Sequence, residues 1–223
     1  MTTAASAGPD RGARRRARNR KRLVDAAAEL MATGGAEALT ISAITEGADL
    51  GAGTFYNYFT SREEIITAIV ADAVETLGVR LDALTRDLQD AAEIYSFSVR
   101  HLVGMAVTDP LWGRMVVRLG VAHDQLNAAL GPRARRDLQI GLDAGRFRIP
   151  DLDVATAVTF GALLSAMHVH LSGDRSADPS STVAELLLRM VGVPAEEAYE
   201  VTRRPLPPLP SVDRAREILA PHR

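Results

Sequence analysis

Cysteine is absent from the 223 residues, which excludes a disulfide framework, a thiol nucleophile and any cysteine-ligated zinc or iron–sulfur site. Aromatic residues make up only 4% of the chain, with a single tryptophan, and lysine occurs once, at Lys21. Apolar residues nevertheless reach 47% and charged residues 24%, so the composition excludes wholesale disorder. The length is sufficient for one large domain or two small ones with a buried core.

The charge is unevenly distributed, although the net charge is only −2. Residues 11–22 contain eight basic side chains and no acidic one, which leaves 18 basic and 28 acidic residues in the rest of the chain. A basic segment on an acidic remainder predicts that a polyanion binds at one end of the protein only.

Neither a secretory signal nor a membrane span is expected. The apolar segment after the basic run is interrupted by Asp25 and Glu29, whereas a signal peptide needs an unbroken one. Residues 154–173 are uncharged, but they include His168, His170 and several hydroxyl side chains, which are costly in lipid. We expect this segment to be a helix buried against protein, and the chain to be cytoplasmic.

Helical periodicity begins near residue 18. A first helix with Leu23, Ala27 and Met31 on one face should end at Gly34-Gly35. Thr40 is a good N-cap for a short second helix that ends near Ala48. A third short helix is expected over about 51–58.

A long fourth helix is expected next. Two overlapping capping boxes precede it, Thr60 with Glu63 or Ser61 with Glu64. The rest of the chain is also helical in pattern, with no convincing β-alternation, near residues 88–108, 110–120, 121–145, 151–173 and 180–192. Four prolines between 205 and 210 form an extended spacer before an optional last helix over 212–219.

The fold class is therefore all-α, with a three-helix head on a larger helical body that binds ligand and dimerises. We expect a disordered Arg-rich arm over 1–17, a helix-turn-helix DNA-binding domain over 18–66, a helical effector-binding and dimerisation domain over 67–204, and a Pro-rich C-terminal tail over 205–223. The sequence leaves open whether the arm and the tail are ordered.

Two short helices joined by a tight turn at Ala48-Asp49-Leu50-Gly51 are typical of a helix-turn-helix. The run Gly53-Thr54-Phe55-Tyr56-Asn57-Tyr58-Phe59 and the first helix around 23–31 resemble the N-terminal signature of TetR-family transcriptional regulators. The resemblance covers about residues 20–70. Beyond these residues, only the helical layout and the short segment 145–148 are similar to the family.

The resemblance implies DNA-contacting roles for side chains of the head. Thr54 and Tyr56 stand where the family contacts phosphates or base edges, Asn57 and Tyr58 at reading or positioning sites, and Thr40 and Arg62 at phosphate contacts. The chain departs from the family pattern at Asp49, where a glycine is common, and at Gly51-Ala52. The small Ser42 likewise replaces a longer side chain, so few bidentate base contacts are possible. We therefore expect Thr54 and Asn57 to read few bases.

The basic arm is expected to supply much of the affinity for DNA. The DNA-contacting arginines are predicted to be Arg14, Arg15, Arg16 and Arg18. The alternative is a solvated tail that only aids solubility, but eight charges beside a helix-turn-helix favour phosphate contact.

A dimer is expected because one short helix spans too few base pairs for specificity. Helices near 153–172 and 181–192 are the candidates for a four-helix interface, although they can also be read as the core of a monomer. Separation of two heads by about 34 Å fits successive major grooves of the DNA.

A small-molecule pocket is implied in the body, where methionine and aromatic side chains suit an adaptable apolar site. The candidate lining is Phe97, His101, Met105, Trp112, Met115, Phe160, Leu164 and Met167. For each residue alone, plain core packing is the simpler reading. The sequence does not name the effector.

A metal site is not expected. His168 and His170 are two residues apart and point to different sides of a helix, while His101 and His123 show no convergence with them. No nucleophile with a base, and no carboxylate cluster, indicates an enzyme, and no cofactor is implied.

The function that these features predict is a ligand-responsive repressor that binds a palindromic operator as a dimer. In this reading a small molecule biases a movement of the fourth helix and thereby the separation of the two heads. The alternatives are an effector-independent DNA binder or an activator of the same fold, and an all-α ligand carrier or enzyme. The operator, the regulated genes and the direction of regulation stay open.

Overall fold

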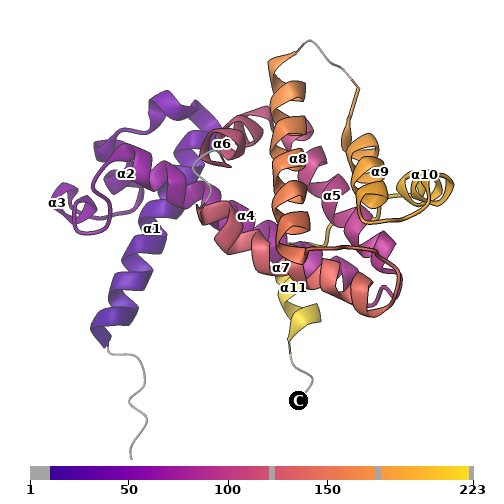
Figure 1. Cartoon of the computed structure of the whole chain (residues 1–223). Helices are drawn as coiled ribbons and strands as arrows, with labels where there is room; N and C mark the ends of the chain where they lie inside the picture. Colours follow the sequence, from indigo (N-terminus) through magenta and orange to yellow (C-terminus); the bar gives the residue numbers. More distant parts are fainter. Residues whose placement is uncertain (1–10, 121–123, 174–176, 221–223) are drawn as a thin grey trace, which may run out of the picture. The chain divides into compact units, whose positions relative to one another are not determined.

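The computed structural model describes residues 11–120, 124–173 and 177–220 (Figure 1). All regular elements in these ranges are helices, so the predicted all-α class is confirmed. The chain divides into two compact units, residues 1–70 and residues 71–223.

The first unit contains α1 (Arg11–Gly34), a 3-10 turn (Ala36–Ala38), α2 (Ile41–Gly47), α3 (Ala52–Phe55) and the start of α4 (Arg62–Thr85). Helix α1 packs on α2, and α2 packs on α3. The largest side chains of this core are at most 1% exposed, and they are Leu23, Leu39, Ile44, Phe55, Phe59 and Ile65. A core of this kind fixes the short α2 and α3, which have little stability as isolated helices.

The basic segment is helical from Arg11 onward, so the expectation of a disordered arm is wrong for residues 11–17. Arginine and alanine are among the better helix formers, and no proline lies between Arg11 and Gly34. The exposed basic turns can therefore continue the helix that Leu23 and Val24 anchor in the core. Residues 1–10 of the predicted arm lie outside the described residues.

The start of α4 uses residues of the two capping boxes that the sequence offers, but in a mixed arrangement. The Ser61 hydroxyl accepts a hydrogen bond from the Glu64 backbone N–H at 3.2 Å. The Glu64 carboxylate in turn accepts from the Thr60 backbone N–H at 2.6 Å and from the Thr60 hydroxyl at 2.8 Å. Ser61 therefore caps α4, whereas the Glu64 carboxylate bonds Thr60, one residue earlier than the Ser61 N–H of a complete capping box. The bonds from Thr60 lower the pKa of the Glu64 carboxyl.

The second unit is built around α5 (Ala91–Thr108). Helices α6 (Pro110–Gly120), α7 (Asp124–Asp143), α8 (Leu152–Ser172), α9 (Ser180–Met190) and α10 (Ala195–Arg203) all contact it, as Figure 1 shows for α8 and α9. Because neighbours surround α5, its buried residues lie on all sides, including Tyr95, Phe97, Val99, Leu102 and Val103.

The turn between α7 and α8 is held by one arginine. Gly145 adopts a φ of 66°, a left-handed conformation that glycine tolerates best. The next residue, Arg146, donates to the Asp90 carboxylate before α5 at 3.0 Å and to Glu197 of α10 at 2.7 Å. Arg146 thus ties the turn to α5 and α10. Burial of Asp90 opposes its ionisation, but these bonds still lower the pKa of the Asp90 carboxyl.

The chain after α10 is ordered along the body. A segment over 204–210 leads to α11 (Val212–Leu219), which matches the optional last helix. Arg100 of α5 donates to the Arg204 carbonyl at 2.9 Å, His101 bonds the Pro207 carbonyl at 2.9 Å, and Arg80 of α4 donates to the Pro210 carbonyl at 2.7 Å. We call residues 204–210 the C-terminal strap. Three side chains of two helices therefore hold it in place.

Candidate DNA-binding and effector-binding sites

The turn between α2 and α3 takes the form that the sequence predicts. Asp49 has a φ of 49°, and its backbone N–H donates to the Glu46 carbonyl at 2.9 Å. Arg22 of α1 donates to both the carbonyl and the carboxylate of Asp49, at 3.2 and 3.0 Å. Aspartate tolerates the left-handed conformation better than most residues, so a glycine is not required here.

Helix α3 is shorter than the predicted span 51–58, because the helix proper ends at Phe55. The next residues continue in turns, with the Asn57 N–H bonded to the Thr54 carbonyl at 3.2 Å and the Tyr58 N–H to the Phe55 carbonyl at 2.9 Å. Asparagine and tyrosine are weak helix formers, which is consistent with this early end.

The aromatic run separates into an anchoring and an outward set. Phe55 and Phe59 are 0% and 1% exposed, and their ring centroids lie 5.7 Å apart. Tyr56 is 62% exposed, Asn57 is exposed, and Thr54 and Tyr58 are half-buried. The two phenylalanines thus fix the segment and leave the hydroxyl, amide and phenol groups available for a partner.

Thr40 and Ser42 are both exposed at the start of α2. The Thr40 hydroxyl oxygen accepts from the Ala43 backbone N–H at 3.1 Å and so caps the helix. Capping uses an oxygen lone pair and leaves the O–H proton free to donate to a phosphate. Arg62 is half-buried in the first turn of α4.

The predicted arginines of the arm lie on the exposed N-terminal turns of α1. Arg14, Arg15, Arg16 and Arg18 are all exposed. Nearer the core, the guanidinium of Arg20 lies 5.1 Å from the centre of the Phe59 ring, where cation and ring attract each other. Over its described part, the basic segment is therefore a helix with exposed positive charges.

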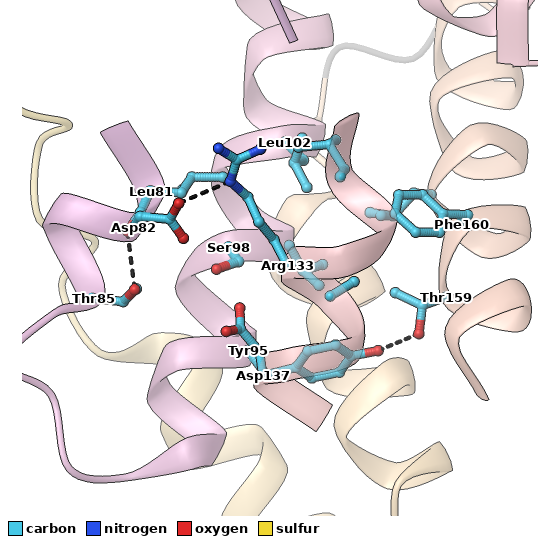
Figure 2. A pocket seen from close by; sticks show the side chains of 14 residues that line it. Leu81, Asp82, Thr85, Tyr95, Ser98, Leu102, Arg133, Asp137, Thr159 and Phe160 are labelled. Atoms are coloured by element: carbon cyan, nitrogen blue, oxygen red, sulfur yellow. Dashed lines mark hydrogen bonds and ion pairs between the residues drawn. The ribbon is translucent and has the colours of Figure 1, made fainter. Parts of the chain in front are cut away.

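A cavity lies within the second unit between α4, α5, α7 and α8 (Figure 2). Its volume is about 40 Å³, which exceeds the space that one water molecule needs. Half of the side chains that line it are apolar, and they are Leu81, Val99, Leu102, Leu130, Ala134, Phe160 and Leu163. Polar side chains supply the rest, namely Asp82, Thr85, Tyr95, Ser98, Arg133, Asp137 and Thr159.

Tyr95 and Thr159 form a polar pair on this wall. Their hydroxyl oxygens are 2.6 Å apart, and Thr159 also donates to the Ala155 carbonyl at 2.8 Å. Since a threonine hydroxyl has one proton, Tyr95 donates to Thr159, and the tyrosine oxygen keeps lone pairs for a further donor. Burial raises the pKa of the Tyr95 phenol, so the group stays neutral at physiological pH.

Charged groups of α4 and α7 line the cavity next to that pair. Arg133 donates from Nε to Asp82 at 2.8 Å, and Arg136 donates to Asp82 at 2.7 Å and to Asp137 at 2.8 Å. Burial raises the pKa of the Asp137 carboxyl, although Arg136 favours its charged form. Carboxylate, guanidinium and phenol together can accept from and donate to the hydroxyl groups of a small polar aromatic molecule.

Of the predicted ligand residues, only Phe160 lines this cavity. Trp112, Leu164 and Met167 line a smaller space of about 10 Å³, to which Phe160 also contributes. Phe97 is a buried residue of α5 in the core of the second unit, and His101 bonds the C-terminal strap. Met105 and Met115 are half-buried and border neither space.

Sequence reasoning missed Tyr95, Asp82, Arg133 and Asp137. The spacing of Arg133 and Asp137, four residues apart on one helix face, was the available signal. Charged residues on a helix are ordinarily solvated, however, so the spacing alone does not single out a cavity.

The predicted interface helices carry exposed apolar side chains. Val154, Val158 and Val169 of α8 are 56%, 46% and 47% exposed, and Leu186 and Met190 of α9 are 59% and 37% exposed. A groove of about 910 Å³ runs between the two helices, with the half-buried His170 on its rim. Four of these five side chains line the groove, and exposed apolar side chains gathered in this way are a feature of interaction surfaces.

Helix α8 is also long and apolar enough to cross a membrane, by length and composition alone. His168 is exposed on α8. His123, the remaining histidine considered for metal binding, lies outside the described residues.

A helix-turn-helix with outward hydroxyl and phenol groups, beside a basic helix and joined in one chain to a helical body with a cavity, defines a DNA-binding transcriptional regulator. The sequence profile described as "Bacterial regulatory proteins, tetR family" matches residues 23–69, and that described as "Tetracyclin repressor-like, C-terminal domain" matches residues 90–204. The chain belongs to the TetR family of bacterial transcriptional regulators.

Solved structures support the assignment along most of the chain. RolR in complex with its ligand resorcinol is 47% identical, with a TM-score of 0.80 over 89% of this chain and 100% of RolR. RolR without ligand is 46% identical, with a TM-score of 0.77 over 85% of this chain and 100% of RolR. FadR from Bacillus subtilis, solved with stearoyl-CoA, is 21% identical with a TM-score of 0.59 over 75% of this chain and 97% of FadR, which shows the fold alone.

Among curated proteins, the repressor KstR of Rhodococcus jostii RHA1 is 38% identical over 61 residues, 27% of this chain. KstR of Mycolicibacterium smegmatis is 33% identical over 63 residues, 28% of this chain. These matches span 29% and 31% of the two relatives, less than a third of their length. The likeness to KstR is thus confined to a short segment, whereas the likeness to RolR includes the body.

Proposed function

We propose that the chain is a cytoplasmic homodimeric repressor whose affinity for a palindromic operator falls when a small dihydroxybenzene, of the resorcinol type, occupies the cavity between α4, α5, α7 and α8. The observation that carries this proposal is the composition of the cavity wall. The apolar side chains of the lining, which include the Phe160 ring, suit a flat aromatic molecule, and the polar side chains suit its hydroxyl groups. At about 40 Å³ the cavity must widen to admit such a molecule. The similarity to RolR over most of the chain, in whose structure resorcinol is bound, supports the same class of effector.

Three groups of the wall can bind the two hydroxyls. The Asp137 carboxyl oxygens and the Tyr95 oxygen can accept hydrogen bonds, and the Arg133 guanidinium can donate them. A hydrogen bond to a charged group contributes about 1.5–3 kcal/mol, so one hydroxyl changes affinity roughly tenfold to a hundredfold. Resorcinol should therefore bind more tightly than phenol, which has one hydroxyl.

Titration calorimetry with resorcinol, phenol and benzene tests the effector class. We expect affinity to fall in that order, and Asp137→Asn to weaken resorcinol binding more than benzene binding. Equal affinity for resorcinol and benzene would show that the polar wall does not recognise hydroxyls and would contradict the proposal.

Operator binding should depend on Thr54, Tyr56, Asn57 and Tyr58 with Thr40, Ser42 and Arg62, and on the arginines of α1. The support is their position around the anchored Phe55 and Phe59 and the exposure of most of them. A mobility-shift assay with DNA flanking its own gene gives the readout, repeated with increasing resorcinol. Release of DNA supports a ligand-responsive repressor, whereas binding that no resorcinol concentration changes supports an effector-independent DNA binder of the same fold.

The contribution of α1 can be separated from that of the turn by salt dependence. Removal of one lysine or arginine contact to a phosphate lowers the slope of log affinity against log salt by about one, whereas loss of a neutral contact does not change it. Replacing Arg14, Arg15 and Arg16 with alanine should therefore flatten the slope, whereas Tyr56→Phe should weaken binding severalfold and leave the slope unchanged. An unaltered slope in the triple variant would remove α1 from the interface.

A second copy of the chain is proposed to cover the apolar face of α8 and α9. Burial of that face in a four-helix contact accounts for its exposed valines, leucine and methionine, so a membrane is not needed to explain them. Two copies also present two reading segments, as a palindromic operator requires.

A further inference from the structure

Arg133 lines the proposed effector cavity and also forms hydrogen bonds with two carboxylates on one face of α4. Its Nε donates to Asp82 at 2.8 Å, Nη1 donates to Glu75 at 2.8 Å and to the Ala129 carbonyl at 2.7 Å, and Nη2 donates to Glu75 at 2.8 Å. Four of its five N–H groups are therefore engaged. A molecule that needs two N–H groups of Arg133 must displace one of the present partners.

Helix α4 is shaped to receive this guanidinium. Glu75, Gly78 and Asp82 are spaced i, i+3 and i+7, so they lie on one face of the helix. A Cβ placed on Gly78 would lie 2.8 Å from Cζ and Nη1 of Arg133 and 2.9 Å from its Nε. The absence of a side chain at Gly78 thus lets the helix backbone approach the guanidinium between the two carboxylates.

The two carboxylates differ in how firmly they are held. The Asp82 side chain is 17% exposed and keeps a second partner in Arg136 at 2.7 Å, while the Glu75 side chain is 51% exposed. Bonding to Arg133 lowers the pKa of the Glu75 carboxyl, so Glu75 is ionised at physiological pH. If Arg133 turned toward the cavity, Asp82 would stay paired, and Glu75 would be solvated at little cost.

We propose that the Glu75–Arg133 pair is the releasable link through which an occupant of the cavity changes the position of α4. The occupant takes N–H groups of Arg133, and Glu75 loses its bidentate partner. The part of α4 around Glu75 and Gly78 is then released from α7, while Asp82 stays paired with Arg136. This inference rests on the proposed effector site, but the Glu75–Arg133 pair itself forms without any ligand.

The variant Glu75→Gln tests the link, with Asp72→Asn as the matched control. Both substitutions remove one negative charge from α4, and Asp72 is an exposed carboxylate three residues before Glu75. Without resorcinol, Glu75→Gln should bind the flanking DNA about threefold to tenfold more weakly than Asp72→Asn, because its α4 resembles the released state. By reciprocity of coupling, resorcinol should bind Glu75→Gln more tightly and change its DNA affinity by a smaller factor.

Gly78→Ala provides a variant that keeps every charge. Its methyl group must push the guanidinium away from α4, so it should shift DNA affinity in the same direction as Glu75→Gln. Gly104→Ala on α5 is its control, since no atom lies within 4 Å of a Cβ at that position.

Hydrogen exchange of residues 71–85 supplies a readout that requires neither effector nor operator. Glu75→Gln should exchange faster in this segment than Asp72→Asn, because it lacks one of the ion pairs that join α4 to α7. Equal exchange and equal DNA affinity in the two variants would overturn the link. If resorcinol leaves the wild-type protein unaffected while Glu75→Gln still differs from its control, the effector class is wrong and the link stands.

Discussion

The hydroxyl of Tyr95 lies 2.6 Å from that of Thr159, and this bond joins α5 to α8 at the wall of the cavity. Both residues are at most 3% exposed, so bulk water does not replace a missing partner. Thr159→Val should destabilise the protein by about 1–3 kcal/mol, because it leaves a buried phenol O–H without an acceptor. Chemical denaturation measures the change.

The double variant tests that interpretation. With Tyr95→Phe as background, the donor is gone, and Thr159→Val should cost clearly less than it does in the wild-type protein. Additive effects of the two substitutions would show that the bond does not contribute to stability.

Gly141 is a second position where the fold allows no side chain. A Cβ there would overlap the Phe147 ring, and Phe147 is itself 3% exposed. Gly141→Ala should therefore destabilise the second unit by about 1–3 kcal/mol, the usual cost of overpacking. Gly104→Ala, also within a helix but with open space, should instead stabilise the protein by up to about 1 kcal/mol. Thermal unfolding of both variants distinguishes steric from helix-propensity effects.

His101 should make stability sensitive to mild acid. Burial lowers the pKa of His101, and the charged Arg100 and Arg80 also disfavour protonation, although the Pro207 carbonyl favours it. The unfolded chain then binds the proton at a higher pH than the folded chain, so stability is fully present above about pH 6.5 and declines as pH falls below it. The pKa values of Glu75 and Asp90 are also lowered, but these two carboxyls change the stability only at a pH below about 4, where carboxyls ordinarily titrate.

The corresponding measurement is the melting temperature across the range from neutral to mildly acidic pH. His101→Gln should show a smaller decline over this interval than the wild-type protein, because glutamine keeps a hydrogen-bond donor and does not titrate. Parallel declines would mean that protonation of His101 is not the cause.

The apolar face of α8 and α9 should determine the oligomeric state. Leu186→Glu places a charge on that face and should shift the protein toward monomer in light scattering after gel filtration. Leu219→Glu on α11 is the control, because Leu219 is also exposed, at 37%, but lies on neither interface helix. A monomer in both variants, or in neither, would remove this face from the proposed interface.

The local features of the head could be predicted because each depends on near neighbours in sequence. The cap at Thr40, the left-handed turn at Asp49 and the cap at Ser61 all follow from side chains within four residues of the backbone they bond. The outward position of Tyr56 follows from the burial of Phe55 and Phe59, which helical spacing also indicated.

The cavity could not be predicted in the same way. Five helices surround α5, so hydrophobic periodicity does not tell the face of Phe97, His101 and Met105 from the face of Tyr95 and Leu102. Which face meets a cavity depends on where α7 and α8 cross it, which is a long-range property. From sequence alone, Arg133 and Asp137 of α7 resemble ordinary solvated surface residues, because nothing in the sequence places α4 opposite them.

The start of α1 shows a different limit. A run of like charges argues for disorder, whereas the helix propensity of alanine and arginine argues for a helix, and residues 11–17 follow the second tendency. The sequence alone did not decide between these two local preferences.

The family profile of the C-terminal domain ends at residue 204. Hydrogen bonds from His101 and Arg80 nevertheless reach Pro207 and Pro210, which lie beyond that residue. A recombinant fragment trimmed at that boundary would deprive Arg80 and His101 of the proline carbonyls that they bond. Laboratories that express the body by itself should therefore retain the sequence through α11, and should place purification handles beyond it with a spacer.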